Sequence, residues 1–235
     1  MIKTILVAAS SVAALSAAAH AEPKFYAGIN FGQTSFSDGE LRGANASGAP
    51  RNIDIEFDSG QFIAGSLGFI AKQNDYGRVR FDVEAAFHDG DVDQLILNDV
   101  ERRVRDGSEI SATTVMINAY YDTPKFAERF RGFAGAGFGV GNIDHEVRYL
   151  VERPEEAGGN LAIAIPSSET TLAYQFVLGA EAEITPHLSF IVDGRFVEFG
   201  DTQVERFVLT TGALDSVLDS DNGTTTVSFG LRARF

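Results

Sequence analysis

The sequence predicts an all-β fold, an eight-stranded antiparallel transmembrane β-barrel, and three observations predict it. First, 44% of the residues are hydrophobic, yet residues 22–235 contain no apolar run of 18, the length that a helical membrane span needs. Second, apolar and polar residues alternate with a period of two, as in a wall with lipid on one side. Third, the connections between the alternating segments are short and long in turn.

The first 21 residues predict a cleaved export signal. Lys3 provides a cationic start, an Ala-rich apolar segment follows, and Ala19-His20-Ala21 fits a small-x-small cleavage site. We therefore expect residues 1–21 to be a signal peptide and residues 22–235 to form a single barrel domain. A transmembrane anchor is the alternative, but the apolar segment is short and rich in Ala and Ser.

Three strands are expected in the first part of the barrel, at residues 24–36, 57–71 and 77–88. Each has an apolar face that would contact lipid and a polar or small face that would line the lumen. The third segment shows the clearest alternation, with Val79, Phe81, Val83, Ala85 and Phe87 on one face and Arg78, Arg80, Asp82 and Glu84 on the other.

Five further strands are expected at residues 109–122, 130–142, 170–184, 188–199 and 223–235. In the segment 130–142, three glycines share a face, which predicts bulky neighbours over them or a bend in the wall. The last strand ends the chain, with Val227, Phe229, Leu231, Ala233 and Phe235 on one face and Ser228, Gly230, Arg232 and Arg234 on the other.

The connections alternate in length, as the two ends of an outer-membrane barrel do. Short connections lie at residues 72–76, 123–128 and 185–187, and long ones at 37–56, 89–108, 144–169 and 201–222. We expect the short ones to be periplasmic turns and the long ones extracellular loops. A soluble β-sandwich is the alternative, but it does not predict this strict alternation.

Charged residues on the inner faces predict a salt-bridge network inside the lumen. An eight-stranded barrel is narrow enough for side chains to meet across it, and both signs of charge are present. A charged pore lining is the alternative, but eight strands leave room for side chains rather than for a water channel. The residues of the expected network are Arg78, Arg80, Asp82, Glu84, Glu181, Asp193, Arg195, Arg232 and Arg234.

Several segments resemble the small eight-stranded barrels of the OmpA/OmpX-type superfamily, the opacity-protein and porin-like group of bacterial outer-membrane proteins. They are residues 25–32 (FYAGINFG), 79–87 (VRFDVEAAF), 116–122 (MINAYYD), 133–139 (FAGAGFG), 173–180 (AYQFVLGA) and 230–235 (GLRARF). The resemblance implies location in the bacterial outer membrane, among its lipids and lipopolysaccharide. It also implies that Phe229, Leu231 and Phe235 form an assembly signal, which the barrel-assembly machinery would read after periplasmic chaperones deliver the chain.

Two groups of residues suggest chemistry, and neither has a convincing pattern. Asp89, Asp91 and Asp93 could ligate Ca²⁺, but Gln94 and Val100 break the EF-hand pattern, so a solvated acidic loop is expected. His187 and Ser189 lie two apart on one strand beside a periplasmic turn, and Glu198 lies on the opposite face, so no triad forms by alternation. We expect no enzyme, no catalytic residues, no metal and no cofactor.

Apolar residues within the long connections predict strands that continue past the membrane and loops that pack on each other. They are Leu95-Ile96-Leu97 and residues 161–165. An exposed patch that binds a partner is the alternative.

The expected function is structural and interactive. The chain would be a monomer that anchors four acidic extracellular loops, supports envelope integrity and binds an extracellular ligand through the loops. A narrow porin is the alternative, and a lipid-modifying barrel enzyme is a remote third. A formal net charge of −14 argues against nucleic acid as a partner, and the absence of cysteine excludes disulfides and thiolate metal sites.

Overall fold

The computed structural model describes residues 24–45, 47–152 and 161–235, which form one antiparallel sheet of thirteen strands. The all-β barrel class is confirmed. The expected count of eight strands is wrong for this described part, because the long connections also fold into strands. No helix in these residues is long and apolar enough to cross a membrane. The expected signal peptide, residues 1–21, lies outside the described residues.

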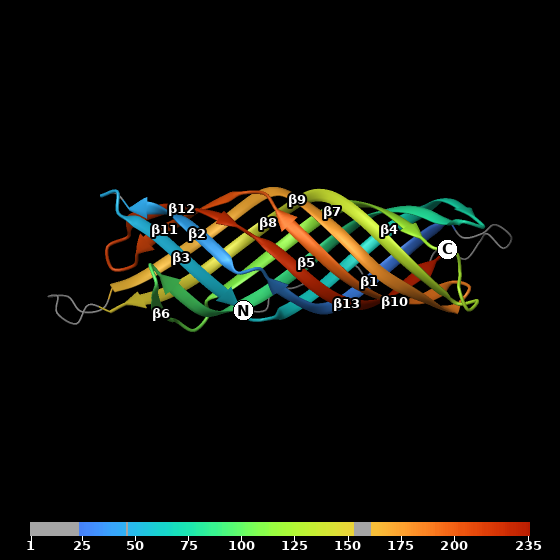
Figure 1. The fold of residues 1–235 in the computed structure, drawn as a ribbon, viewed down its shortest axis with the longest axis horizontal. Coiled ribbons are helices and arrows are strands. Elements are labelled where there is room, and N and C mark those ends of the chain that lie inside the picture. Colours follow the sequence, from blue (N-terminus) through green and yellow to red (C-terminus); the bar gives the residue numbers. More distant parts are fainter. Residues whose placement is uncertain (1–23, 46, 153–160) are drawn as a thin grey trace.

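Eight strands form a closed ring, and each matches one of the eight expected segments (Figure 1). Each pairs with the next, and the last pairs with the first, from Tyr26↔Arg234 to Phe36↔Thr224. We call this the membrane ring. Its strands in order are β1 (Phe25–Phe36), β4 (Gly60–Asn74), β5 (Gly77–Leu97), β7 (Glu109–Asp122), β8 (Phe130–Val151), β9 (Leu161–Thr185), β10 (Leu188–Phe199) and β13 (Gly223–Arg234).

Five further strands lie in the long connections: β2 (Gly39–Asn45), β3 (Pro50–Phe57), β6 (Val100–Val104), β11 (Thr202–Val208) and β12 (Ala213–Asp221). With the far ends of β5, β8 and β9 they form a second closed ring, in the order β2, β3, β5, β6, β8, β9, β11, β12 and back to β2. We call this ring the extension. It lies at the end of the molecule opposite the C-terminus (Figure 1).

The outer face of the membrane ring is apolar over a limited height. On β8, the outward side chains of Phe138 and Val140 are exposed, and the next outward residues are Asn142 and Asp144. On β5, the outward face changes from Phe87 to Asp89, and Asp89 is in register with Asp144 through Ser111 of β7. This change marks the edge of the lipid-facing band, so the extension lies outside the membrane.

The three glycines of β8 lie beneath bulky neighbours, as expected from their shared face. A Cβ atom on Gly135 would lie 2.2 Å from the ring of Tyr120, and one on Gly137 would meet the side chain of Asn118. A Cβ atom on Gly139 would collide with the backbone of β7. The glycines therefore let the inner side chains of β7 lie flat against β8.

Candidate functional site

The lumen of the membrane ring brings all nine of the charged residues named from the sequence to its interior. Each is at most 9% exposed, because alternation points every second side chain of the wall inward. They come from four strands, β5, β9, β10 and β13. The residues are Arg78, Arg80, Asp82, Glu84, Glu181, Asp193, Arg195, Arg232 and Arg234.

One group of charges lies toward the short turns and centres on two carboxylates. Arg78 donates to Asp122 Oδ2 at 2.5 Å and to Glu181 Oε2 at 2.7 Å, and Arg80 donates to Asp122 Oδ1 at 3.0 Å. Arg232 donates to the same Glu181 oxygen at 2.7 Å. These bonds link β5, β7, β9 and β13, so the group spans the lumen.

A second group lies further along the lumen, around Arg195 on β10. Arg195 donates to Glu84 of β5 at 2.6 Å and to Asp193 at 2.7 Å. The nearby Asp82 carboxylate accepts hydrogen bonds from Tyr26 and Asn118, both at 2.8 Å. Each buried charge in this group therefore has a partner, which offsets the cost of removing it from water.

Aromatic rings fill the space around the arginines. The Arg80 guanidinium carbon lies 3.7 Å from the centroid of the Tyr120 ring and 5.1 Å from that of Phe133. Arg232 lies 5.1 Å from the ring centroid of Tyr26. The cavity beside these side chains has a volume of about 10 Å³, which has room for about one water molecule.

Asp122 and Glu183 are described members of the network that the nine expected residues leave out, and Asp122 is the more buried of the two. It is fully buried and accepts from both Arg78 and Arg80. The nine expected residues have one arginine in excess, and Asp122 and Glu183, which accepts from Arg234 at 3.1 Å, add two carboxylates to them. Arg131 of β8 is also buried and donates to the backbone oxygen of Thr123. The signal was present in the sequence, because Asp122 has the same parity as the inward residues Asn118 and Tyr120 of its strand.

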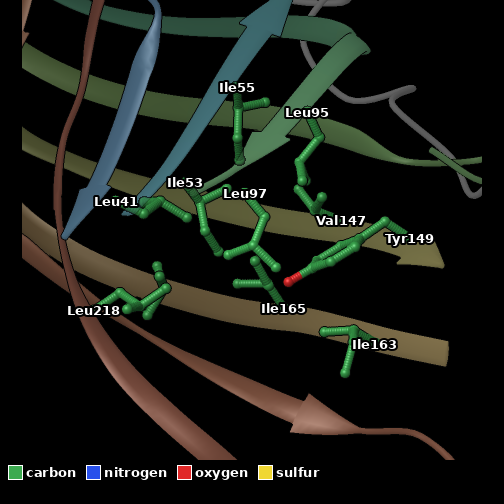
Figure 2. Close-up of a cluster of buried hydrophobic side chains, with 11 residues drawn as sticks. Leu41, Ile53, Ile55, Leu95, Leu97, Val147, Tyr149, Ile163, Ile165 and Leu218 are labelled. Atoms are coloured by element: carbon green, nitrogen blue, oxygen red, sulfur yellow. The ribbon is translucent and has the colours of Figure 1, made fainter. Parts of the chain in front are cut away.

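The extension has an apolar interior. Its side chains come from seven of the eight strands of the extension and meet at its centre, as Figure 2 shows for most of them. They include residues of both apolar segments noted in the sequence, so the expectation that strands continue past the membrane and pack on each other is confirmed. The cluster consists of Leu41, Ile53, Ile55, Leu95, Leu97, Val147, Tyr149, Ile163, Ile165, Val204 and Leu218.

A small group of polar residues borders this apolar interior. Arg206 donates to the Tyr149 hydroxyl at 2.5 Å and to Asp215 Oδ2. Arg51 Nε lies 3.5 Å from the same Asp215 oxygen. Burial raises the pKa of the Tyr149 hydroxyl, which therefore stays protonated at neutral pH.

The residues of the expected assembly signal lie on the outer face at the closing seam. Phe229 and Leu231 are exposed on β13, where lipid would cover them. The ring of Phe235 stacks on that of Phe25 at 6.5 Å, and the two residues exchange backbone hydrogen bonds. The last residue of the chain therefore helps to close the barrel.

The structure does not bring His187, Ser189 and Glu198 together. The His187 ring contacts the backbone oxygen of Arg234, and the Ser189 hydroxyl donates to Glu181. Glu198 is exposed on the outer face, opposite Ser189. Asp89 and Asp91 lie within β5 rather than in a loop. Among the described residues, no group of three or more His, Asp or Glu side chains could hold a metal ion.

Comparison with known proteins gives a family and a fold. A model of the family described as "Outer membrane protein beta-barrel domain" matches residues 4–235. The outer membrane protein OprG from Pseudomonas aeruginosa is similar in structure, with a TM-score of 0.59 and 13% identity over 92% of this chain and 98% of that chain. The outer membrane protease OmpT from Escherichia coli has a TM-score of 0.55 and 10% identity, covering 91% and 97%. A comparison with curated proteins finds no match.

Proposed function

Since this chain belongs to the outer membrane protein beta-barrel domain family, and so lies in the bacterial outer membrane, we propose that it is a closed barrel that carries a folded extension at the cell surface. In this role the barrel is an anchor and the extension is the part that meets the surroundings of the cell. The lipids and lipopolysaccharide of the membrane are its immediate neighbours.

The observation that carries this proposal is that the interior is filled at two heights. In the membrane ring, five arginines and the carboxylates paired with them bond across the lumen around a cavity of about 10 Å³. In the extension, side chains from opposite walls form an apolar core. Ions would have to cross both layers, and the second has few polar groups to replace their water.

The remaining features fit an anchored, non-catalytic protein. One of the two similar structures is a protease, but the described lumen and extension are filled by ion pairs and apolar packing. The hydroxyl of Thr34, which lies 3.3 Å from His88 Nδ1, is fully buried in the lumen. We propose that residues 1–21 are removed on export, that the seam of Phe229, Leu231 and Phe235 is read during barrel assembly, and that the protein acts as a monomer.

The test is single-channel conductance of the refolded residues 22–235 in a planar bilayer. Heat-modifiable gel mobility of the same sample would show that the barrel has folded. We expect a folded barrel with no steady conductance. Reproducible conductance from a folded sample would contradict the closed barrel and support the narrow porin.

A further inference from the structure

The polar group at the border of the apolar core differs from the lumen network in its balance of charge. In the lumen network, each of the five expected arginines pairs with at least one carboxylate. In the extension, the guanidinium groups of Arg51 and Arg206 share a single carboxylate oxygen, that of Asp215. Arg206 is buried, and the side chains of Arg51 and Asp215 are each about one-fifth exposed. Among the described residues, two cations that share one anion leave a net positive charge here, inside a strongly acidic protein.

The same group has more hydrogen-bond donors than acceptors. Arg51 Nε is buried and makes no hydrogen bond. The Tyr149 hydroxyl accepts from Arg206 but, among the described residues, donates to no acceptor. Asp215 Oδ2 already accepts from Arg206 and from the Ser216 hydroxyl. Hydrogen-bond donors that lack an acceptor and lie beside a net positive charge favour binding of an acceptor that carries negative charge.

We propose that Arg51, Arg206 and Tyr149 form a binding site for one small oxyanion of the phosphate type at the cell surface. The proposal rests on the proposed function in one respect, that the extension faces the outside. Two guanidinium forks match the oxygens of a tetrahedral oxyanion, and a neutral phenol adds a third donor. The strongly acidic chain as a whole would repel a long polyanion, so a single group is favoured.

The test is isothermal titration of refolded residues 22–235 in detergent micelles with inorganic phosphate, at constant ionic strength. We expect saturable binding of one phosphate per chain. Arg51→Gln should weaken it at least tenfold, because it removes one fork and half of the positive charge. Asp215→Asn should instead tighten binding severalfold, because it removes the carboxylate that competes for the same donors.

Arg42→Gln is the matched control. Arg42 lies in the same extension, but its side chain is exposed and pairs with Glu40 and Asp54. Its loss should leave phosphate binding within about twofold. No saturable binding by the folded wild type, or equal weakening by Arg51→Gln and Arg42→Gln, would overturn the site. Neither result depends on conductance, so the site and the closed barrel can fail separately.

Discussion

At the scale of single residues, Glu181 connects more of the lumen than any other carboxylate described here. Its two oxygens accept from Arg78, Arg232 and Ser189, and Arg234 lies 3.7 Å away. A buried carboxylate is costly when it is alone and tolerable when it is paired. Removing Glu181 would therefore destabilise the barrel mainly because its arginine partners would remain buried and unpaired. Arginines without a counterion in this lumen would find little water in its place, since the cavity beside them has room for about one molecule.

Glu181→Gln should lower the free energy of unfolding by about 3–5 kcal/mol, because it leaves buried guanidinium charge uncompensated. Urea denaturation in lipid vesicles, followed by far-UV circular dichroism and gel mobility, would measure it. Glu198→Gln on the outer face is the control and should change stability by about 0.5 kcal/mol or less. Equal effects of the two substitutions would show that the lumen network adds little to stability.

His145 makes the stability of the extension depend on pH. It is buried on β8 beyond the lipid-facing band, and burial lowers the pKa of its imidazole to about 4. The unfolded chain has a His pKa of about 6.5, so between these values the unfolded state binds more protons. The stabilising effect of the neutral ring is complete above pH 6.5 and is lost as the pH falls toward 4.

The free energy of unfolding should therefore fall by up to about 3 kcal/mol between pH 7 and pH 4 through this residue. The measurement is urea denaturation across that range for the wild type and for His145→Gln. The difference in free energy of unfolding between the wild type and His145→Gln should shrink as the pH falls. A difference that stays constant with pH would show that His145 does not carry this dependence.

At the scale of elements, the strands of the membrane ring could be predicted because each one has apolar residues on its lipid face and polar or small residues on its lumen face. In β5, the apolar residues from Val79 to Phe87 alternate with the charged residues from Arg78 to Glu84. This pattern is visible in the sequence without knowledge of the partner strands. The strands of the extension could not be predicted in the same way. Ile53 and Ile55 also alternate with charged residues, but β3 is short, and only pairing with β2 and the far end of β5 makes it part of a wall.

The turn between β7 and β8 contains backbone strain that its sequence does not relieve. Ala127 and Glu128 both have positive φ values, 48° and 63°, a region that glycine and asparagine adopt more readily. The turn between β5 and β6 uses Asn98 and Asp99 in the same region, which suits it better.

Glu128→Gly should therefore raise the free energy of unfolding by about 1 kcal/mol, because glycine has no Cβ to clash at this φ. The urea midpoint of the refolded barrel would measure the change. Glu128→Ala is the control, since it removes the same carboxylate but keeps a Cβ atom. If alanine stabilised the turn as much as glycine, the cause would be charge and not backbone strain.

At the scale of the whole molecule, two closed rings share three long strands, β5, β8 and β9. The ring in the membrane has a polar interior and an apolar outside, and the extension has the reverse. For the interior of the membrane ring, the sequence predicted nine of the charged residues but not Asp122, Glu183 or Arg131. It could not predict the group of Arg51, Arg206 and Asp215, because these residues meet only when the extension closes.

Ile53→Asp should open the extension and leave the membrane ring intact. Ile53 is fully buried in the apolar cluster of the extension, where an unpaired carboxylate is very costly. Limited proteolysis of vesicle-embedded protein should then cleave the long connections, while a heat-modifiable core persists. Asn52→Asp adds the same charge to the exposed neighbour and should leave the protease resistance unchanged. Loss of heat-modifiable mobility in I53D would show that the rings fold as one unit.

The length of β9 sets how far the protein stands above the bilayer. Its outward residues are apolar from Leu172 onward, so residues 161–170 lie beyond the lipid. At about 3.3 Å per residue and a tilt of roughly 40°, this segment rises roughly 25 Å from the membrane surface. In the proposed orientation at the cell surface, a column of that height holds its tip away from the bilayer. The residues at the tip would then meet what diffuses toward the cell before it reaches the membrane itself.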